Sequence, residues 1–412
     1  MSPVNRREIL LGGVAAAGLG ASGGLLVSRL ALAAGPDGPR GEARLVFVIL
    51  RGAVDGLAAV PPWGDPDYGR LRPGIAIAAP GAAQGALPLD GLFGLHPRLA
   101  FLHECYAAAE LTVFHAVAGP YRQRSHFDGQ DVLENGATAA HALQTGWLNR
   151  ALAALPAPAR QGRQQLGVAL GRNLPLLMRG PAAVASWAPS RLAALDEDTL
   201  QRVQDLYAQD PLLAQRLADA LATNAMATAA GGDARQGAGP AARYAEVVRA
   251  TAGFLRRDAG PRVAVFDTQG WDTHANEGAA QGQLGQRLGA LDAGLRLLKD
   301  ELGSAWRDTA VILATEFGRT AAVNGTRGTD HGTATVAFLL GGAVRGGRVV
   351  ADWPGLSARA LYQQRDLAPT LDLRSVFKGV LQEQLQLPGA ELERSVFPGS
   401  AGAAPLRDLI RA

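Results

Sequence analysis

The chain has 412 residues, and its 40 Lys or Arg against 37 Asp or Glu give a formal net charge of only +3 at pH 7. The basic residues are almost all arginines spread along the chain, so the composition argues against a nucleic-acid-binding surface. The single cysteine, Cys105, excludes an intramolecular disulfide framework, and its helical, apolar surroundings are typical of a buried structural thiol.

Residues 1–33 have the organisation of a twin-arginine signal peptide. A charged start with Arg6 and Arg7 precedes a Gly/Ala/Leu-rich run over 9–27, and Ala31-Leu32-Ala33 supplies a small-x-small cleavage site. The alternative is a retained membrane anchor, but the many glycines and alanines make the run weakly apolar. We therefore expect cleavage, export to the periplasm or the exterior through the Tat translocase, and a mature chain without a stable membrane span.

The remainder, 34–412, predicts a single α/β domain. Apolar runs without alternation indicate strands that are covered on both faces of a parallel sheet. These runs are 45–50, 111–117, 167–170, 263–266, 309–314 and 334–340. Helical patterns lie between them, at 97–110, 195–209, 212–223, 241–257, 283–302 and 366–385. The alternation predicts a doubly wound, mostly parallel sheet.

Two stretches interrupt this alternation. The helices from about 195 to 257 are expected to form an inserted helical lobe. Within it, residues 228–241 are nearly all Gly, Ala and small polar residues, which predicts a surface loop.

Polar side chains gather where several predicted strands end, which is where ligands bind in sheets of this kind. Three of the seven histidines, His126, His274 and His331, lie in these segments, each near a carboxylate. The polar residues of these segments include Asp55, Asp272, His274, Glu316 and His331, and Asp272 and His274 are two residues apart, so one turn can aim both at a single point. Imidazole and carboxylate donors without a thiolate suit Zn, Mn, Mg or Fe.

Ser125 is expected to open a helix through Glu134, where its hydroxyl lies at an N-terminus that favours anions. Arginines near the same segments could clamp a tetrahedral oxyanion. They are Arg122, Arg124 and Arg319. Each feature has an ordinary alternative, since Ser125 can be a simple N-cap, Asp55-Gly56 a turn and Arg319 a surface ion pair. The coincidence of polar clusters at four strand ends favours a site.

These blocks resemble domain-of-unknown-function family 1501, whose members look similar to the alkaline phosphatase and sulfatase superfamily. The matching blocks are Arg51–Gly56, Ser125–Gln130, Gly146–Leu148, Asp272–His274, Thr315–Arg319 and Asp330–Gly332. The resemblance implies an alkaline-phosphatase-like fold and hydrolysis of phosphate or sulfate esters, in a small molecule or a polymer.

The resemblance also implies roles for individual residues. Ser125 would be the nucleophile, and Arg319 would steer the anion. Asp272, His274 and His331 would hold a divalent metal (Zn, Mn or Mg), with Asp55 and Glu316 at a poorer second position. Possible anion-binding or supporting residues are Arg122, Arg124, His126 and Asp330.

Phe317 stands where the superfamily places a histidine ligand, so one metal is expected rather than two. The alternative is a secreted, non-catalytic binding or assembly protein on a degenerate form of the fold.

Overall fold

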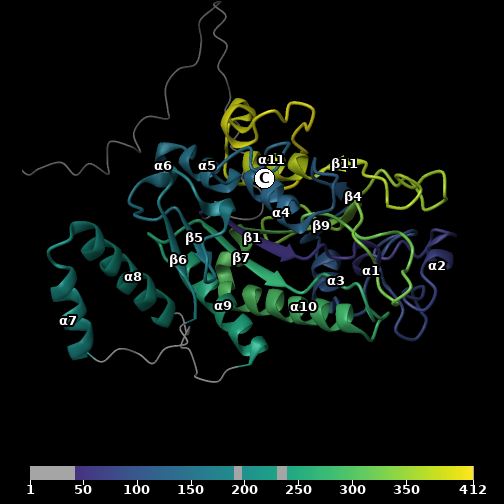
Figure 1. The fold of residues 1–412 in the computed structure, drawn as a ribbon, viewed down its shortest axis with the longest axis horizontal. Helices are drawn as coiled ribbons and strands as arrows, with labels where there is room; N and C mark the ends of the chain where they lie inside the picture. The colour runs from purple at the N-terminus through teal and green to yellow at the C-terminus, as the bar shows by residue number, and fades with distance from the viewer. Residues whose placement is uncertain (1–41, 190–196, 230–238, 412) are drawn as a thin grey trace, which may run out of the picture. The chain divides into compact units, whose positions relative to one another are not determined.

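A computed structural model describes residues 42–189, 197–229 and 239–411 (Figure 1). The predicted signal peptide lies outside these residues. Within the part of the chain that is described, no helix has the length and apolar character needed to cross a membrane.

Nine strands of the described residues form one central sheet. Along the sheet they are β10 (Arg348–Val350), β4 (Leu111–Ala118), β9 (Thr335–Leu340), β8 (Thr309–Ala314), β1 (Arg44–Arg51), β7 (Val263–Gln269), β5 (Gly167–Leu170) and β6 (Val184–Trp187), with β11 (Leu371–Asp372) also paired to β4. β9 is antiparallel to both neighbours, and the other pairings are parallel. This confirms the predicted mostly parallel α/β sheet. A separate hairpin joins β2 (Leu87–Pro88) to β3 (Gly94–Leu95).

Helices cover both faces of the sheet, which explains why the strand sequences do not alternate (Figure 1). Val46, Val48 and Leu50 of β1 belong to one apolar core, together with side chains of α3 (Ala100–Ala107), α9 (Pro240–Leu255) and α10 (Gln283–Leu302). Leu45, Phe47 and Ile49 belong to the other, with side chains of α5 (Trp147–Ala153) and α11 (Leu373–Gln384).

The sequence placed the start of α11 too early, at residue 366. Leu371 and Asp372 instead pair with β4 as a short strand. The Asp372 side chain then accepts a hydrogen bond from the Arg374 backbone N–H (2.8 Å), which caps the helix and fixes its first residue as Leu373.

The predicted lobe contains α7 (Glu197–Tyr207), α8 (Pro211–Ala229) and α9. Leu206 and Leu212 are exposed on α7 and α8, whereas Val248 and Phe254 of α9 are buried in the core. Most of the predicted loop at 228–241 lies outside the described residues; α8 extends to Ala229, and α9 begins at Pro240.

Short helices complete the fold. They are α1 (Gly56–Ala59), α2 (Tyr68–Leu71), α4 (His126–Asn135, ten residues), α6 (Ala157–Arg160), α12 (Gly389–Glu391), the 3-10 turns Leu176–Met178 and Gly303–Asp308, and a π-helical turn at Leu392–Val396.

Candidate metal centre

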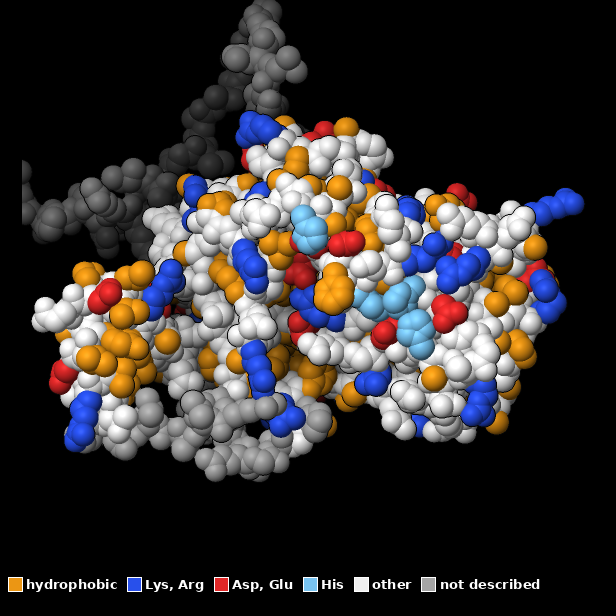
Figure 2. All heavy atoms as spheres, in the orientation of Figure 1, with side chains coloured by type: hydrophobic (Ala, Val, Ile, Leu, Met, Phe, Trp, Pro, Cys, Tyr) orange, Lys and Arg blue, Asp and Glu red, His pale blue; other side chains and the backbone are white. Residues whose placement is uncertain are grey.

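The carboxyl ends of β1, β7 and β8 lie side by side, because Arg51 is in register with Gln269 and Ile49 with Ala314. The segments that follow these strands converge with the start of α4. Within the segment after β8, an isolated antiparallel bridge pairs Arg319 with His331. Histidine side chains gather on this face of the molecule beside acidic and basic ones (Figure 2).

The turn after β1 touches the loop after β7 through Gly52. Its φ is +119°, and a Cβ at this position would lie 2.8 Å from the Asp272 backbone nitrogen. Glycine is therefore required here both by the backbone conformation and by the close approach. The contact fixes the loop that carries Asp272 and His274 against the end of β1.

Three imidazoles surround one carboxylate oxygen, Asp272 Oδ1. The Nε2 atoms lie at 3.0 Å for His274, 3.2 Å for His331 and 3.4 Å for His126. The Nε2 atoms of His274 and His331 are 3.0 Å apart. We call His126, Asp272, His274 and His331 the histidine cluster.

Each imidazole of the histidine cluster is held through its other nitrogen by an oxygen. The Nδ1 atoms lie 2.8 Å from Glu316 Oε1 for His126, 3.1 Å from Asp330 Oδ1 for His274, and 2.9 Å from the Arg124 carbonyl for His331. An N–H on Nδ1 that donates to such an oxygen leaves Nε2 with its lone pair. This arrangement orients histidines that bind metals.

The donor set fits one divalent cation. His126, Asp272 and His331 each offer a ligand atom, and these atoms all lie within 4.8 Å of one another. Donors bound tetrahedrally at about 2.0 Å are separated by about 3.3 Å, close to the spacing around Asp272 Oδ1. A hydrogen bond between the Nε2 atoms of His274 and His331 would explain only their own close approach, and not the approach of His126 to Asp272. His126 Nε2 is buried without a hydrogen-bond partner among the described residues, and a cation would satisfy it.

Arg319 lies against the histidine cluster but is fully engaged. Its buried guanidinium donates to Asp272 Oδ1 (2.5 Å) and to the carbonyls of Ala53 (2.9 Å) and Thr329 (3.2 Å). Burial alone would raise the pKa of Asp272, but the charge of Arg319 outweighs it and holds that pKa below its usual value. In this geometry Arg319 orients Asp272 instead of presenting free N–H groups to an anion.

Glu316 is buried and acts on His126. Its Oε1 accepts from the Gly52 backbone N–H (2.9 Å) and from Gln130 Nε2 (3.0 Å) as well as from His126. Burial would raise the pKa of Glu316, but these hydrogen bonds lower it overall. The same contact raises the pKa of His126. The His126 ring also stacks on Phe317, with centroids 5.0 Å apart.

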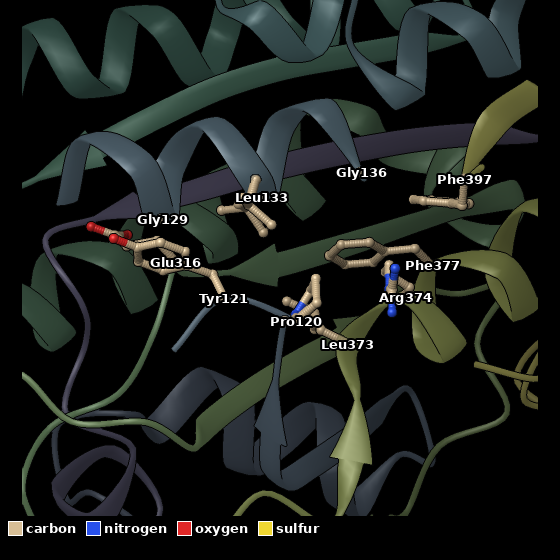
Figure 3. A pocket seen from close by; sticks show the side chains of 12 residues that line it. Pro120, Tyr121, Gly129, Leu133, Gly136, Glu316, Leu373, Arg374, Phe377 and Phe397 are labelled. Atoms are coloured by element: carbon tan, nitrogen blue, oxygen red, sulfur yellow. The ribbon is translucent and has the colours of Figure 1, made fainter. Parts of the chain in front are cut away.

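A small apolar cavity lies under α4 with Glu316 at one end (Figure 3). Tyr121, Leu133 and Phe377 are among its lining residues, and its volume is about 10 Å³. A cavity of this size holds at most one water molecule, so it is not a substrate site.

The structure does not bring Asp55 into the histidine cluster. The Asp55 carboxylate is buried against the guanidinium of Arg72 (2.7 Å) and also caps α1 through the Ala58 backbone N–H (3.1 Å). Glu316 contacts Nδ1 of His126 and not the Nε2 atom that approaches Asp272. The second ligand position that the resemblance implied is therefore not assembled from Asp55 and Glu316.

The remaining predicted anion-binding arginines are also engaged elsewhere. Arg124 pairs with the buried Asp366 (2.6 Å), and Arg122 donates to the carbonyls of Gly119 and Tyr121. Burial lowers the pKa of Arg122. Ser125 is the N-cap residue of α4, directly before His126, and its side chain makes no capping hydrogen bond.

Sequence reasoning gave His126 only a supporting role and missed Gln130 and Asn324. Asn324 donates to Asp330 Oδ1 (3.0 Å) and to the His274 carbonyl (2.9 Å), which fixes the carboxylate behind His274. The block from Ser125 to Gln130 already contained His126 and Gln130 together. The sequence could not tell which of them would point into the cluster.

The fold and the histidine cluster define an α/β protein with a polar site at the carboxyl edge of a mostly parallel sheet. The chain belongs to the family described as "Protein of unknown function (DUF1501)", whose model matches residues 115–396. This confirms the family predicted from the sequence motifs, and the Arg51–Gly56 turn lies outside the matched range. No curated protein matches the sequence.

Several solved structures show a weak similarity. The C-terminal periplasmic domain of EcEptC from Escherichia coli, in complex with Zn, has 10% identity, a TM-score of 0.34 and 73% coverage of each chain. Phosphonate monoester hydrolase of Agrobacterium radiobacter has 11% identity and a TM-score of 0.32, covering 84% of this chain and 74% of that one. A protein in the alkaline phosphatase superfamily from Vibrio parahaemolyticus has 11% identity and a TM-score of 0.29, covering 74% and 61%. With TM-scores of at most 0.34, these similarities do not assign the chain to the alkaline phosphatase superfamily.

Proposed function

We propose that the chain is a divalent-metal-dependent hydrolase of phosphate or sulfate esters. The observation that carries this proposal is the convergence of three imidazole Nε2 atoms on Asp272, each ring held by an oxygen at Nδ1. Such a donor set suits a divalent cation, and a cation beside an ester would account for its place at this edge of the sheet.

A divalent cation held there would act as a Lewis acid toward an ester oxygen and lower the pKa of a neighbouring hydroxyl. The chain's own residues prepare the place. Glu316 and Asp330 fix the rings of His126 and His274, and Arg319 fixes the carboxylate of Asp272. Because these supports are hydrogen-bonded in turn, the donors are preorganised.

Ser125 is the proposed nucleophile. It lies at the first turn of α4 directly before His126, and its hydroxyl is not used to cap the helix. The backbone N–H groups at the start of this ten-residue helix favour negative charge on the transferred group. Attack by the Ser125 oxygen would displace the leaving alcohol, and water would then release the bound group.

The test pairs metal content with hydrolysis. The purified protein should hold about one equivalent of divalent metal by plasma mass spectrometry and should cleave a 4-nitrophenyl phosphate monoester, diester or sulfate. His331→Ala should lose metal and activity together, because it removes a donor, whereas His103→Ala, outside the histidine cluster, should keep both. Ser125→Ala should keep the metal yet lower kcat by about 10³ or more.

The possible outcomes distinguish attack by Ser125, attack by water and a non-catalytic protein. Ser125→Ala that holds metal and turns over as fast as the wild type would mean that water, and not Ser125, attacks the ester. Wild-type protein that binds no metal and cleaves no ester would leave the second candidate, a secreted binding or assembly protein. One observation favours that candidate: Arg122, Arg124 and Arg319 each donate hydrogen bonds to groups within the protein.

A further inference from the structure

A polar cleft of about 570 Å³ opens beside the histidine cluster, at the carboxyl ends of β1, β5 and β7. Phe127 and Gln130 of α4 line its wall. The cleft and the cluster share structure, because Gln130 and His126 both donate to Glu316 Oε1 (3.0 and 2.8 Å) and Phe127 follows His126 in the chain. A ligand held at the cluster therefore has this cleft next to it.

Phe127 is the most unusual residue of the cleft. Its side chain is 88% exposed. The other exposed large hydrophobic residues in the described part of the chain, Leu206, Leu212 and Leu213, all lie on α7 and α8. An aromatic ring left in water at the first turn of α4 offers a face on which a ligand ring can stack.

Three arginines and three carboxylates line the cleft, and two of the arginines lack a carboxylate partner among the described residues. The carboxylate of Asp131 accepts hydrogen bonds from Asn135 and from the His141 backbone N–H. Arg51 is neutralised by Glu134 and Asp267, at 2.7 Å each. Arg172 and Arg179 are exposed lining residues without a carboxylate at ion-pair distance in the described ranges. Arg179 uses one N–H on the Leu174 carbonyl (3.0 Å). Two guanidinium groups thus remain available for an anion.

We propose that this cleft binds the non-reacting part of the substrate, with a ring of the ligand stacked on Phe127 and a second phosphate or sulfate group on Arg172 and Arg179. The proposal rests on the proposed function, in which the ester that reacts lies at the histidine cluster. A cleft of this volume fits a ligand of a few hundred daltons. The two unpaired arginines and the amide of Asn173 suit an anionic ligand rather than an acyl chain.

Two ligand sources share this chemistry, a nucleotide with two phosphates and a sugar with two sulfates. The test uses isothermal titration calorimetry with adenosine 3′,5′-bisphosphate and with a disulfated disaccharide, each beside its unesterified parent. At least one of the esterified probes should bind, and its parent should bind at least about tenfold more weakly, because it lacks the charged groups that the arginines would contact.

Variants locate the binding in the cleft. Arg172→Gln combined with Arg179→Gln, and separately Phe127→Ala, should each weaken the probe about tenfold or more. Both should leave metal content and cleavage of small 4-nitrophenyl esters unchanged. The matched controls are Arg407→Gln and Leu212→Ala, which alter an exposed arginine and an exposed leucine outside the cleft. They should bind as the wild type does.

The outcomes distinguish failure of the cleft proposal from failure of the proposed function. If small esters are cleaved but neither probe binds, or the cleft variants bind as tightly as the wild type, the cleft proposal is overturned and the proposed function stands. If no ester is cleaved but probe binding depends on Phe127 and the two arginines, the cleft proposal is supported and the hydrolase fails. The tighter of the two probes identifies the ligand source.

Discussion

Arg72 is buried with two carboxylates, Asp55 and Glu277, that both act on its charge. Asp55 and Arg72 form a fully buried ion pair, and Glu277 accepts from Thr273 (3.1 Å) and Thr329 (2.8 Å). Burial would raise the pKa of Asp55, but Arg72 lowers it overall. Burial and the neighbouring Asp55 raise the pKa of Glu277 well above its usual 4.5. Asp55 is therefore the charged partner of Arg72, and Glu277 is a neutral hydrogen-bonding group.

This difference predicts opposite effects of two isosteric changes. In the folded state Glu277 keeps its proton above pH 4.5, where the unfolded chain loses it. Its contribution to stability is therefore complete below that pH and declines as the pH rises, by up to about 1.4 kcal/mol per pH unit until its folded pKa is reached. Glu277→Gln should match the wild type near pH 5 and become the more stable protein at pH 8. Asp55→Asn should cost about 3–5 kcal/mol near neutral pH, because Arg72 loses its counter-charge.

Urea unfolding at pH 5, 6.5 and 8 measures both effects. Glu104→Gln, on an exposed carboxylate, serves as the control. A Glu277→Gln protein as unstable as Asp55→Asn at every pH would show that Glu277 is ionised in the folded protein.

At the scale of elements, the histidine cluster depends on how closely two strand-end turns approach. Gly52→Ala should place a Cβ 2.8 Å from the Asp272 nitrogen in a backbone conformation that alanine avoids. We expect a loss of about 2–4 kcal/mol and a displaced Asp272, and hence weaker metal binding. Gly74→Ala is the matched control, because Gly74 also has a positive φ (+78°) but open space at its Cβ. It should lose about 1 kcal/mol and keep the metal.

Thermal unfolding and metal content distinguish the two alanine variants. Equal losses in both proteins, with the metal retained, would mean that the contact between these turns does not position Asp272. In that case the cost at Gly52 would come from backbone conformation alone.

The strands differ in how well the sequence predicts them. Long buried strands such as β1 and β8 were predicted within a residue of their ends, because a continuous apolar run leaves few alternatives. Short edge strands such as β10 and β11 were missed, since pairing with β4 and not their composition makes them strands. The four strand-end segments were predicted to meet, and Asp272, His274 and His331 were expected at one site, where they lie together. His126 was expected only in a supporting role. His126 lies in the cluster because it is the first residue of α4 and Glu316 holds its ring. The helix start at Ser125 was predicted, but the contact between His126 and Glu316 is not visible in the sequence.

At the scale of the whole molecule, the histidine cluster exists only in the folded chain. Its members come from the start of α4, the loop after β7 and the segment before β9, so an ion can be held only after the sheet has assembled. The twin-arginine route carries proteins that are already folded. We propose that the chain uses this route, which allows the metal to be inserted before export.

Changing both Arg6 and Arg7 to lysine tests this proposal in the full chain. The wild-type protein should be recovered outside the cytoplasm with a new N-terminus near Ala34 or Gly35, as read by N-terminal sequencing. The double variant should accumulate in the cytoplasm as a precursor with residues 1–33 attached, because the paired arginines are the feature that the translocase recognises. Arg29→Lys changes an arginine of the same segment outside the pair, and it should be exported and cleaved normally. Efficient export of the double variant, or a membrane-held mature protein that still begins at Met1, would reject the route. The metal content of the stranded precursor is measured as well, because a precursor that already holds the ion would show that folding and metal insertion precede export.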